Sequence, residues 1–179
     1  YTSGTTGRPK GCMLTHANFV DLSDNALSTL GHIVNEQAST LMFLPLAHVF
    51  ERAWVESASL VDGNTHVYFA ETLDTFLADL NRARPTTFIS VPRLWLKFQQ
   101  GVFTKLPPKK LDRLLSIPIL GRIVGRKVLK GLGLDQALLA GSGSAPIPAD
   151  LIAWYRRLGL NLIEGYAMTI GRASCRERV

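Results

Sequence analysis

The chain has 179 residues, enough for one domain or a large part of one, and its 46% apolar and 19% charged residues exclude a disordered or collagen-like protein. Its two cysteines, Cys12 and Cys175, exclude a disulfide framework and a four-thiolate zinc site, and they favour a reducing, cytoplasmic setting. The net charge is +6, and no apolar run approaches the ~18 residues needed to span a bilayer.

The first half of the chain alternates helical periods with short apolar runs. Apolar residues recur at steps of three and four after a potential N-cap at Thr15, which predicts a helix with its buried face at Phe19, Leu22, Ala26 and Leu30. Runs of apolar or β-branched residues predict strands at 40–46, 66–69 and 86–91. Further helical periods, ended by a glycine and a proline, predict helices at 49–63 and 73–85.

The second half continues this alternation. A strand is expected within 136–143, opening into a Gly/Ser loop, then a helix over 150–158 capped by Gly159 and a last strand within 161–166. The order predicts an α/β fold with a largely parallel sheet and flanking helices. Ligands of such sheets bind at the carboxyl ends of the strands. The informative loops should therefore follow Tyr1, Leu44, Val91, Ala140 and Ile163.

A basic stretch interrupts the pattern between Lys105 and Lys130. Eight basic residues against Asp112 give it a charge of +7, so the rest of the chain sums to 6 − 7 = −1. The proline pair at 107–108 predicts a surface excursion here. Two interpretations remain open: a solvated helix whose long side chains cover apolar neighbours, or a peripheral contact with anionic membrane lipid. We expect no nucleic-acid partner, because no recognition motif accompanies the charge.

The first eleven residues, YTSGTTGRPKG, carry the strongest chemical signal. Glycines permit unusual backbone geometry, hydroxyls and successive amides can cradle an anion, and a lysine supplies a point charge. The pattern is not a Walker A motif, since Pro9 precedes the lysine and Gly11 follows it. A plain glycine-rich turn is the rival interpretation. The predicted phosphate-binding residues are Thr2, Ser3, Gly4, Thr5, Thr6, Gly7 and Lys10.

This segment resembles the phosphate loop of the adenylate-forming superfamily, which includes acyl-CoA synthetases, luciferases and peptide-synthetase adenylation domains. Four later segments resemble family motifs in the same order: LPLAHVFER at 44–52, ARPTTFISVPRLW at 83–95, AGSGSAPI at 140–147 and EGYAMT at 164–169. The segments LPLAHVFER at 44–52 and GSGSAPI at 141–147 resemble long-chain acyl-CoA synthetases in particular. The resemblance covers 1–169 and implies that the chain is part of the family's large N-terminal domain.

The resemblance implies that a carboxylate attacks the α-phosphate of ATP, pyrophosphate leaves, and the thiol of coenzyme A then displaces AMP from the acyl-adenylate. The loop at 2–10 would hold the β- and γ-phosphates, and Thr169 would contact the α-phosphate. His48 would lie near the acyl-adenylate, at the mouth of the acyl tunnel. Lys10, Thr169 and His48 are the predicted catalytic residues. The predicted adenine-side residues are Gly143, Ser144, Ala145, Glu164, Gly165 and Tyr166, with the tyrosine stacking on the base.

Several of these residues have a structural alternative. His48 could cap the helix that follows it, Tyr166 could belong to the core, and Glu164 is expected to be structural rather than catalytic. Arg93 could have no role in the site and serve only to pair with a carboxylate. Glu51 and Arg52 are expected to form a local ion pair.

We predict no metal site held by the protein alone. The histidines His16, His32 and His66 show no metal-ligand spacing with Cys, Asp or Glu. Mg²⁺ is expected to arrive with ATP.

Both ends of the sequence depart from the family pattern. The chain begins at Tyr1 without a Met, and Ile170 stands where the family has a Mg²⁺-binding glutamate. We therefore expect residues 1–169 to be a partial AMP-binding domain, truncated at both ends, and 170–179 to be a non-native tail, such as a translated adapter. The chain alone is expected to be inactive, because the ribose motif and the C-terminal domain with its lysine are missing.

The leading functional hypothesis is a long-chain fatty acid–CoA ligase, cytoplasmic and in contact with membranes through 105–130. A ligase that loads a carrier protein is a neighbouring alternative. A non-catalytic membrane-surface module with the same basic contact is an alternative from another class. A nucleoside-triphosphate hydrolase is disfavoured, because neither a Walker A motif nor an apolar strand ending in aspartate is present.

Overall fold

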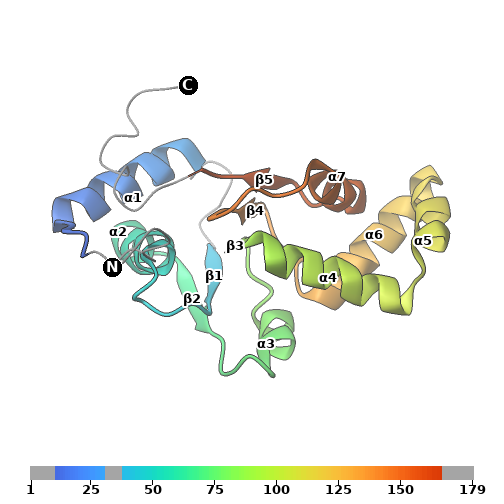
Figure 1. Ribbon diagram of the computed structural model, residues 1–179, viewed down its shortest axis with the longest axis horizontal. Helices are drawn as coiled ribbons and strands as arrows, with labels where there is room; N and C mark the ends of the chain where they lie inside the picture. The colour runs from blue at the N-terminus through green and yellow to red at the C-terminus, as the bar shows by residue number, and fades with distance from the viewer. Residues whose placement is uncertain (1–10, 31–37, 167–179) are drawn as a thin grey trace.

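The computed structural model describes residues 11–30 and 38–166 of the chain. Its centre is a parallel sheet in the strand order β2-β1-β3-β4-β5 (Figure 1). The strands span Ser39–Met42 (β1), His66–Phe69 (β2), Thr87–Ser90 (β3), Leu139–Ser142 (β4) and Leu162–Glu164 (β5). All run in one direction, so their carboxyl ends share one edge of the sheet. The predicted parallel α/β sheet is confirmed.

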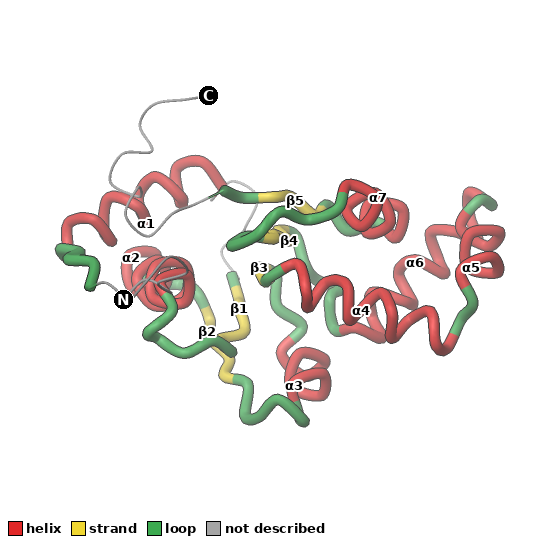
Figure 2. The backbone as a smooth tube through the Cα atoms, in the orientation of Figure 1, coloured by secondary structure: helices red, strands yellow, loops and turns green. Residues whose placement is uncertain are grey.

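Helices cover both faces of this sheet (Figures 1 and 2). One face carries α1 (His16–Leu30) and a π-helix, η1 (Glu51–Ser57), which continues into α2 (Ala58–Asp62). The other face carries α3 (Phe76–Ala83), α4 (Pro92–Lys105), α6 (Pro118–Leu132) and α7 (Ala149–Leu158), and α5 (Pro108–Leu115) packs against α6 farther out. No helix in the described ranges is long and apolar enough to cross a membrane.

The main core lies between the sheet and the second group of helices. Phe88 of β3 packs against Trp95 and Phe98 of α4, with the Phe88 and Trp95 rings edge to face at 5.5 Å. Tyr155 of α7 packs against Trp95 at 5.0 Å. These aromatic side chains are almost fully buried, so they fix α4 and α7 relative to the central strands.

The predicted elements are present, with two differences. The first strand ends at Met42, before Pro45, and is shorter than 40–46. The helix predicted over 49–63 is a π-helix through its middle, in which the Ala58 N–H donates to the Ala53 carbonyl five residues back. Its predicted end is confirmed, because Gly63 adopts the left-handed conformation that caps the helix, at φ 71°.

The N-cap predicted at Thr15 is also confirmed. Its Oγ1 accepts the backbone N–H of Asn18 at 3.3 Å, and its own N–H donates to Asn18 Oδ1 at 3.0 Å. This reciprocal pair satisfies backbone donors at the start of α1.

Candidate active site

The candidate site lies along the carboxyl edge of the sheet. Four connections meet that edge in the spatial order of their strands: 43–50 after β1, Val91 and the start of α4 after β3, 143–148 after β4, and 165–166 after β5. All four were predicted to be informative. A fifth predicted loop, with Thr2, Ser3, Gly4, Thr5, Thr6, Gly7 and Lys10, lies outside the described residues, as does Thr169.

Three hydrogen bonds anchor the loops after β4 and β5, one to the end of β3 and two between the β4 and β5 segments. The Gly143 N–H donates to the Ser90 carbonyl at 3.1 Å, and the Gly165 N–H donates to the Ser142 carbonyl at 2.8 Å. The Ile147 N–H donates to Glu164 Oε1 at 3.0 Å. Glu164 therefore ties one loop to the other, which agrees with the structural role expected for it. The predicted residues Gly143, Glu164 and Gly165 are brought together.

Between these anchors the loop after β4 turns outward. Ser144 has a φ of 69°, and both Ser144 and Ala145 are exposed. Gly143 lies close to Gly165, since a Cβ on it would come 3.5 Å from the Gly165 carbonyl oxygen. Because this loop is held by hydrogen bonds at Gly143 and Ile147 and is exposed between them, a planar ring can approach its backbone.

Tyr166 stands next to this backbone with 85% of its surface exposed. The alternative that this ring belongs to the core is wrong. An exposed aromatic ring beside exposed peptide groups has the character of a stacking surface for a base.

Buried hydrogen bonds support the β4 loop from beneath. Trp95 Nε1 donates to the Gly141 carbonyl at 3.1 Å, and the Tyr155 hydroxyl donates to the Trp95 carbonyl at 2.7 Å. Burial raises the pKa of the Tyr155 hydroxyl, so it remains a donor at any ordinary pH. Residues remote from the loop thus hold the strand from which it emerges.

The loop after β1 carries His48, which is half-buried. Its Nδ1 accepts the backbone N–H of Phe50 at 3.3 Å, so the capping alternative is supported. In a neutral imidazole with Nδ1 accepting, the proton resides on Nε2. The cap therefore fixes the ring and leaves Nε2 as a hydrogen-bond donor, which makes the two roles compatible.

Glu51 holds the same loop from inside. Its Oε1 accepts the N–H of Phe43 at 2.7 Å and of Leu44 at 3.1 Å, and the side chain is fully buried. Burial raises the pKa of this carboxyl, and the two backbone hydrogen bonds offset only part of that effect. The predicted Glu51–Arg52 ion pair is wrong, because Arg52 instead pairs with Glu56 at 3.0 Å.

The sequence did contain a signal that Glu51 is buried, but a charged residue is normally expected at the surface. It lies four residues before Val55, on the buried side of η1, where a carboxylate needs internal partners. The loop that precedes the helix supplies such partners, the free N–H groups of Phe43 and Leu44.

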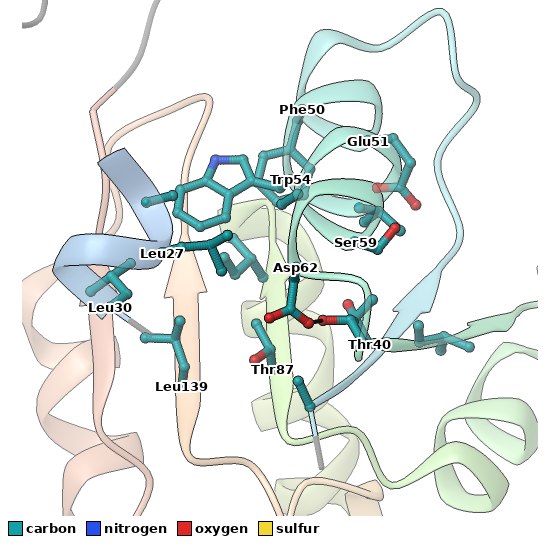
Figure 3. A pocket seen from close by; sticks show the side chains of 17 residues that line it. Leu27, Leu30, Thr40, Phe50, Glu51, Trp54, Ser59, Asp62, Thr87 and Leu139 are labelled. Atoms are coloured by element: carbon teal, nitrogen blue, oxygen red, sulfur yellow. Dashed lines mark hydrogen bonds between the residues drawn. The ribbon is translucent and has the colours of Figure 1, made fainter. Parts of the chain in front are cut away.

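An apolar cavity of about 120 Å³ opens behind Glu51, between η1, α1 and the sheet (Figure 3). Leu27 and Leu30 of α1 and Trp54 of η1 face it from one side. The other side is the sheet, with Thr40, Thr87 and Leu139 from three neighbouring strands. Phe50, at the end of the loop that carries His48, also lines the cavity, which runs beneath the helices along the sheet.

Arg93 is exposed at the start of α4, and none of the ion pairs within residues 11–30 and 38–166 includes it. Within the same ranges, no three His, Cys, Asp or Glu side chains gather as metal ligands.

Comparison with protein families shows which family the chain belongs to. A family model described as AMP-binding enzyme matches residues 1–171, almost the whole chain. The chain belongs to the AMP-binding enzyme family.

Curated members of the family resemble the chain over most of its length. It is 33% identical to the peroxisomal acyl-CoA ligase 891 of Penicillium brevicompactum, over 97% of the chain. It is 32% identical to long-chain-fatty-acid–CoA ligase 1 of Homo sapiens over 98% of the chain, and 31% identical to long-chain-fatty-acid–CoA ligase FadD15 of Mycobacterium tuberculosis over 94%. The chain spans only 28%, 28% and 32% of these relatives.

Solved structures of AMP-binding enzymes share the fold. The adenylation domain of a carboxylate reductase from Mycobacterium chelonae superimposes with a TM-score of 0.72 at 25% identity, covering 94% of this chain and 26% of that one. ATP-bound MatB from Rhodopseudomonas palustris gives a TM-score of 0.63 at 26% identity, covering 94% and 28%. The domain boundary predicted near residue 169 and the tail predicted at 170–179 lie outside the described residues and stay predictions.

Proposed function

We propose that the protein containing this AMP-binding domain activates a long-chain fatty acid with ATP and transfers the acyl group to coenzyme A. The observation that carries the proposal is the apolar cavity, whose wall includes Phe50 at the end of the His48 loop, on the sheet edge that also carries the exposed Ser144, Ala145 and Tyr166. Relatives named as long-chain acyl-CoA ligases support the substrate class.

In this proposal the adenine stacks on Tyr166 and faces the backbone of Gly143, Ser144 and Ala145. Gly165 allows close approach, and Glu164 keeps the two loops together through Ile147. The loop at 2–7 and Lys10 neutralise the triphosphate. This backbone and lysine chemistry suits a phosphoryl transfer, where positioning and charge stabilisation dominate.

The fatty acyl chain occupies the cavity, with its carboxylate near His48. One carboxylate oxygen forms a bond to the α-phosphorus while the bond to the pyrophosphate oxygen breaks, and Thr169 contacts the α-phosphate. The His48 Nε2–H donates to the carboxyl group and orients it. The thiol of coenzyme A then attacks the acyl carbon, and AMP leaves. Mg²⁺ accompanies ATP and shields the phosphate charge, with no ligand assigned to it among the described residues.

Pyrophosphate release by the complete protein tests this proposal. We expect release that depends on a fatty acid and increases from short to long chains. His48→Gln should lower kcat, whereas His66→Gln, at an exposed position of β2, should leave it unchanged. Absence of fatty-acid-dependent pyrophosphate release across all chain lengths would contradict the proposal.

A second candidate acceptor is the phosphopantetheine thiol of a carrier protein. It is favoured by the fold match to an adenylation–carrier didomain of a carboxylic acid reductase from Segniliparus rugosus, at a TM-score of 0.67 and 26% identity, covering 90% of this chain and 22% of that one. Parallel assays with coenzyme A and with a carrier protein separate the two acceptors. Faster AMP release with coenzyme A supports the ligase.

A further inference from the structure

The outer surface of α6 combines cationic and apolar side chains in one stripe. Six exposed residues of α6 are spaced so that they share one side of the helix. They are Ile119, Arg122, Ile123, Arg126, Lys127 and Lys130. The stripe continues through the start of α6 into the turn that precedes it, and every residue of 116–120 is exposed.

Close helix packing fixes which side of α6 faces outward. Gly121 and Gly125 lie on the opposite side, where a Cβ would come within 2.6 Å of the Leu115 carbonyl and 2.5 Å of the Leu158 carbonyl. The helix therefore presses its glycines against α5 and α7. It cannot rotate to bury the stripe without opening both contacts.

The apolar part of the stripe is large for a solvated surface. Ile119 is 78% exposed, Ile123 60% and Ile117 48%. A surface that needed only solubility would carry polar side chains at a turn. Helix α5 and its turn into α6 lie at the end of the molecule that is remote from α1 (Figure 1).

The charge around these isoleucines is almost entirely positive. On α5 the exposed cations are Lys109, Lys110 and Arg113. The one carboxylate of the stretch, Asp112, is paired with Arg157 of α7 at 2.7 Å, so it does not neutralise the stripe. Exposed isoleucines next to exposed cations of α5 and α6 match the chemistry of a bilayer surface, with acyl chains below and anionic headgroups above.

We propose that the α5–α6 tip docks this domain on membranes that contain anionic phospholipid. The isoleucines insert at the headgroup boundary, and the cations of α5 and α6 contact the phosphates. Each cation near such a surface raises the affinity roughly fivefold. The contact uses no residue of the candidate active site, so it is independent of the proposed ligase activity.

Vesicle sedimentation tests the proposal with vesicles of neutral phosphatidylcholine and vesicles that include about 30% phosphatidylserine. We expect binding to the anionic vesicles alone, weakened when salt is raised from about 0.1 M to about 0.5 M. The double variant Lys127→Glu/Lys130→Glu should bind at least about tenfold more weakly. Lys97→Glu, an exposed lysine of α4, is the control and should bind within about twofold of wild type.

A second variant reports insertion directly. Ile119→Trp should show a blue-shifted indole emission on anionic vesicles, relative to the same vesicles with wild-type protein, because the added ring enters an apolar medium. Equal binding to both vesicle types, an equal loss in Lys97→Glu, or an unshifted emission would overturn the proposal. So would binding to a soluble polyanion in the absence of binding to vesicles.

Discussion

Glu51 offers the sharpest test of how the His48 loop is held. Its carboxylate accepts two backbone N–H groups with one oxygen, and its other oxygen is buried with no hydrogen-bond partner among residues 11–30 and 38–166. Glu51→Ala removes the acceptor of two largely buried donors, at about 1–3 kcal/mol each. Relief of the buried charge offsets part of this, so we expect a net loss of about 2 kcal/mol in the free energy of unfolding.

Glu51→Gln separates the hydrogen bonds from the charge. The amide oxygen can accept the same two N–H groups, and the substitution removes the ionisable group. Because burial raises the pKa of Glu51, the folded protein holds this proton more tightly than the unfolded chain does. Wild-type stability should therefore fall as pH rises from about 4.5 to the folded pKa, by about 1.4 kcal/mol per pH unit inside that window. The Gln variant should lack this decline.

Urea unfolding followed by tryptophan fluorescence measures both effects. The control is Glu56→Gln, which removes a partly exposed ion pair one helical turn later and should cost less than about 1 kcal/mol. The reasoning would be refuted if the stability difference between Glu51→Gln and wild type did not change with pH above 4.5. It would also be refuted if Glu51→Ala cost no more than the control.

Three further predictions concern the fold that supports the site. Gly125→Ala should destabilise the protein by about 1–3 kcal/mol, because the added Cβ would overlap a carbonyl of α7. Gly131→Ala should stabilise the protein by about 0.5–1 kcal/mol, because there is open space around this helical glycine. Thermal unfolding measures both effects. Tyr155→Phe should lose about 1 kcal/mol of stability in urea with its buried hydrogen bond, and an equal effect of Tyr68→Phe at an exposed position would contradict this. Hydrogen bonds from the Glu71 N–H, Thr75 and Arg82 lower the pKa of Asp79, so its stabilising contribution is present above pH 3.8 and is lost as pH falls toward the folded pKa. In urea unfolding, the free energy of unfolding of Asp79→Asn should fall less at acid pH than that of the wild type. An equal fall in both proteins would contradict this prediction.

The elements were predictable where a local signal fixes them. Proline and glycine mark the ends of helices, as Pro85 does after α3 and Gly159 does after α7. Apolar runs of three or four residues mark the strands. The parallel order followed from the alternation of strands and helices, and the edge that carries the site followed from the parallel order.

What the sequence did not reveal depends on contacts between distant residues. The burial of Glu51 depends on N–H groups seven and eight residues earlier, which become free only because β1 ends at Met42. The support of the β4 loop by Trp95 joins residues 46 positions apart. The outward face of α6 was not predictable either, because it depends on which carbonyls meet Gly121 and Gly125.

The fate of the carboxylate oxygens tests the central claim most directly. The complete protein would be given ATP, coenzyme A and a long-chain fatty acid in which both carboxylate oxygens carry a heavy isotope. If the carboxylate attacks the α-phosphorus, each AMP released contains one labelled oxygen, and pyrophosphate contains none. Label in inorganic phosphate, or unlabelled AMP formed together with the thioester, would contradict the account.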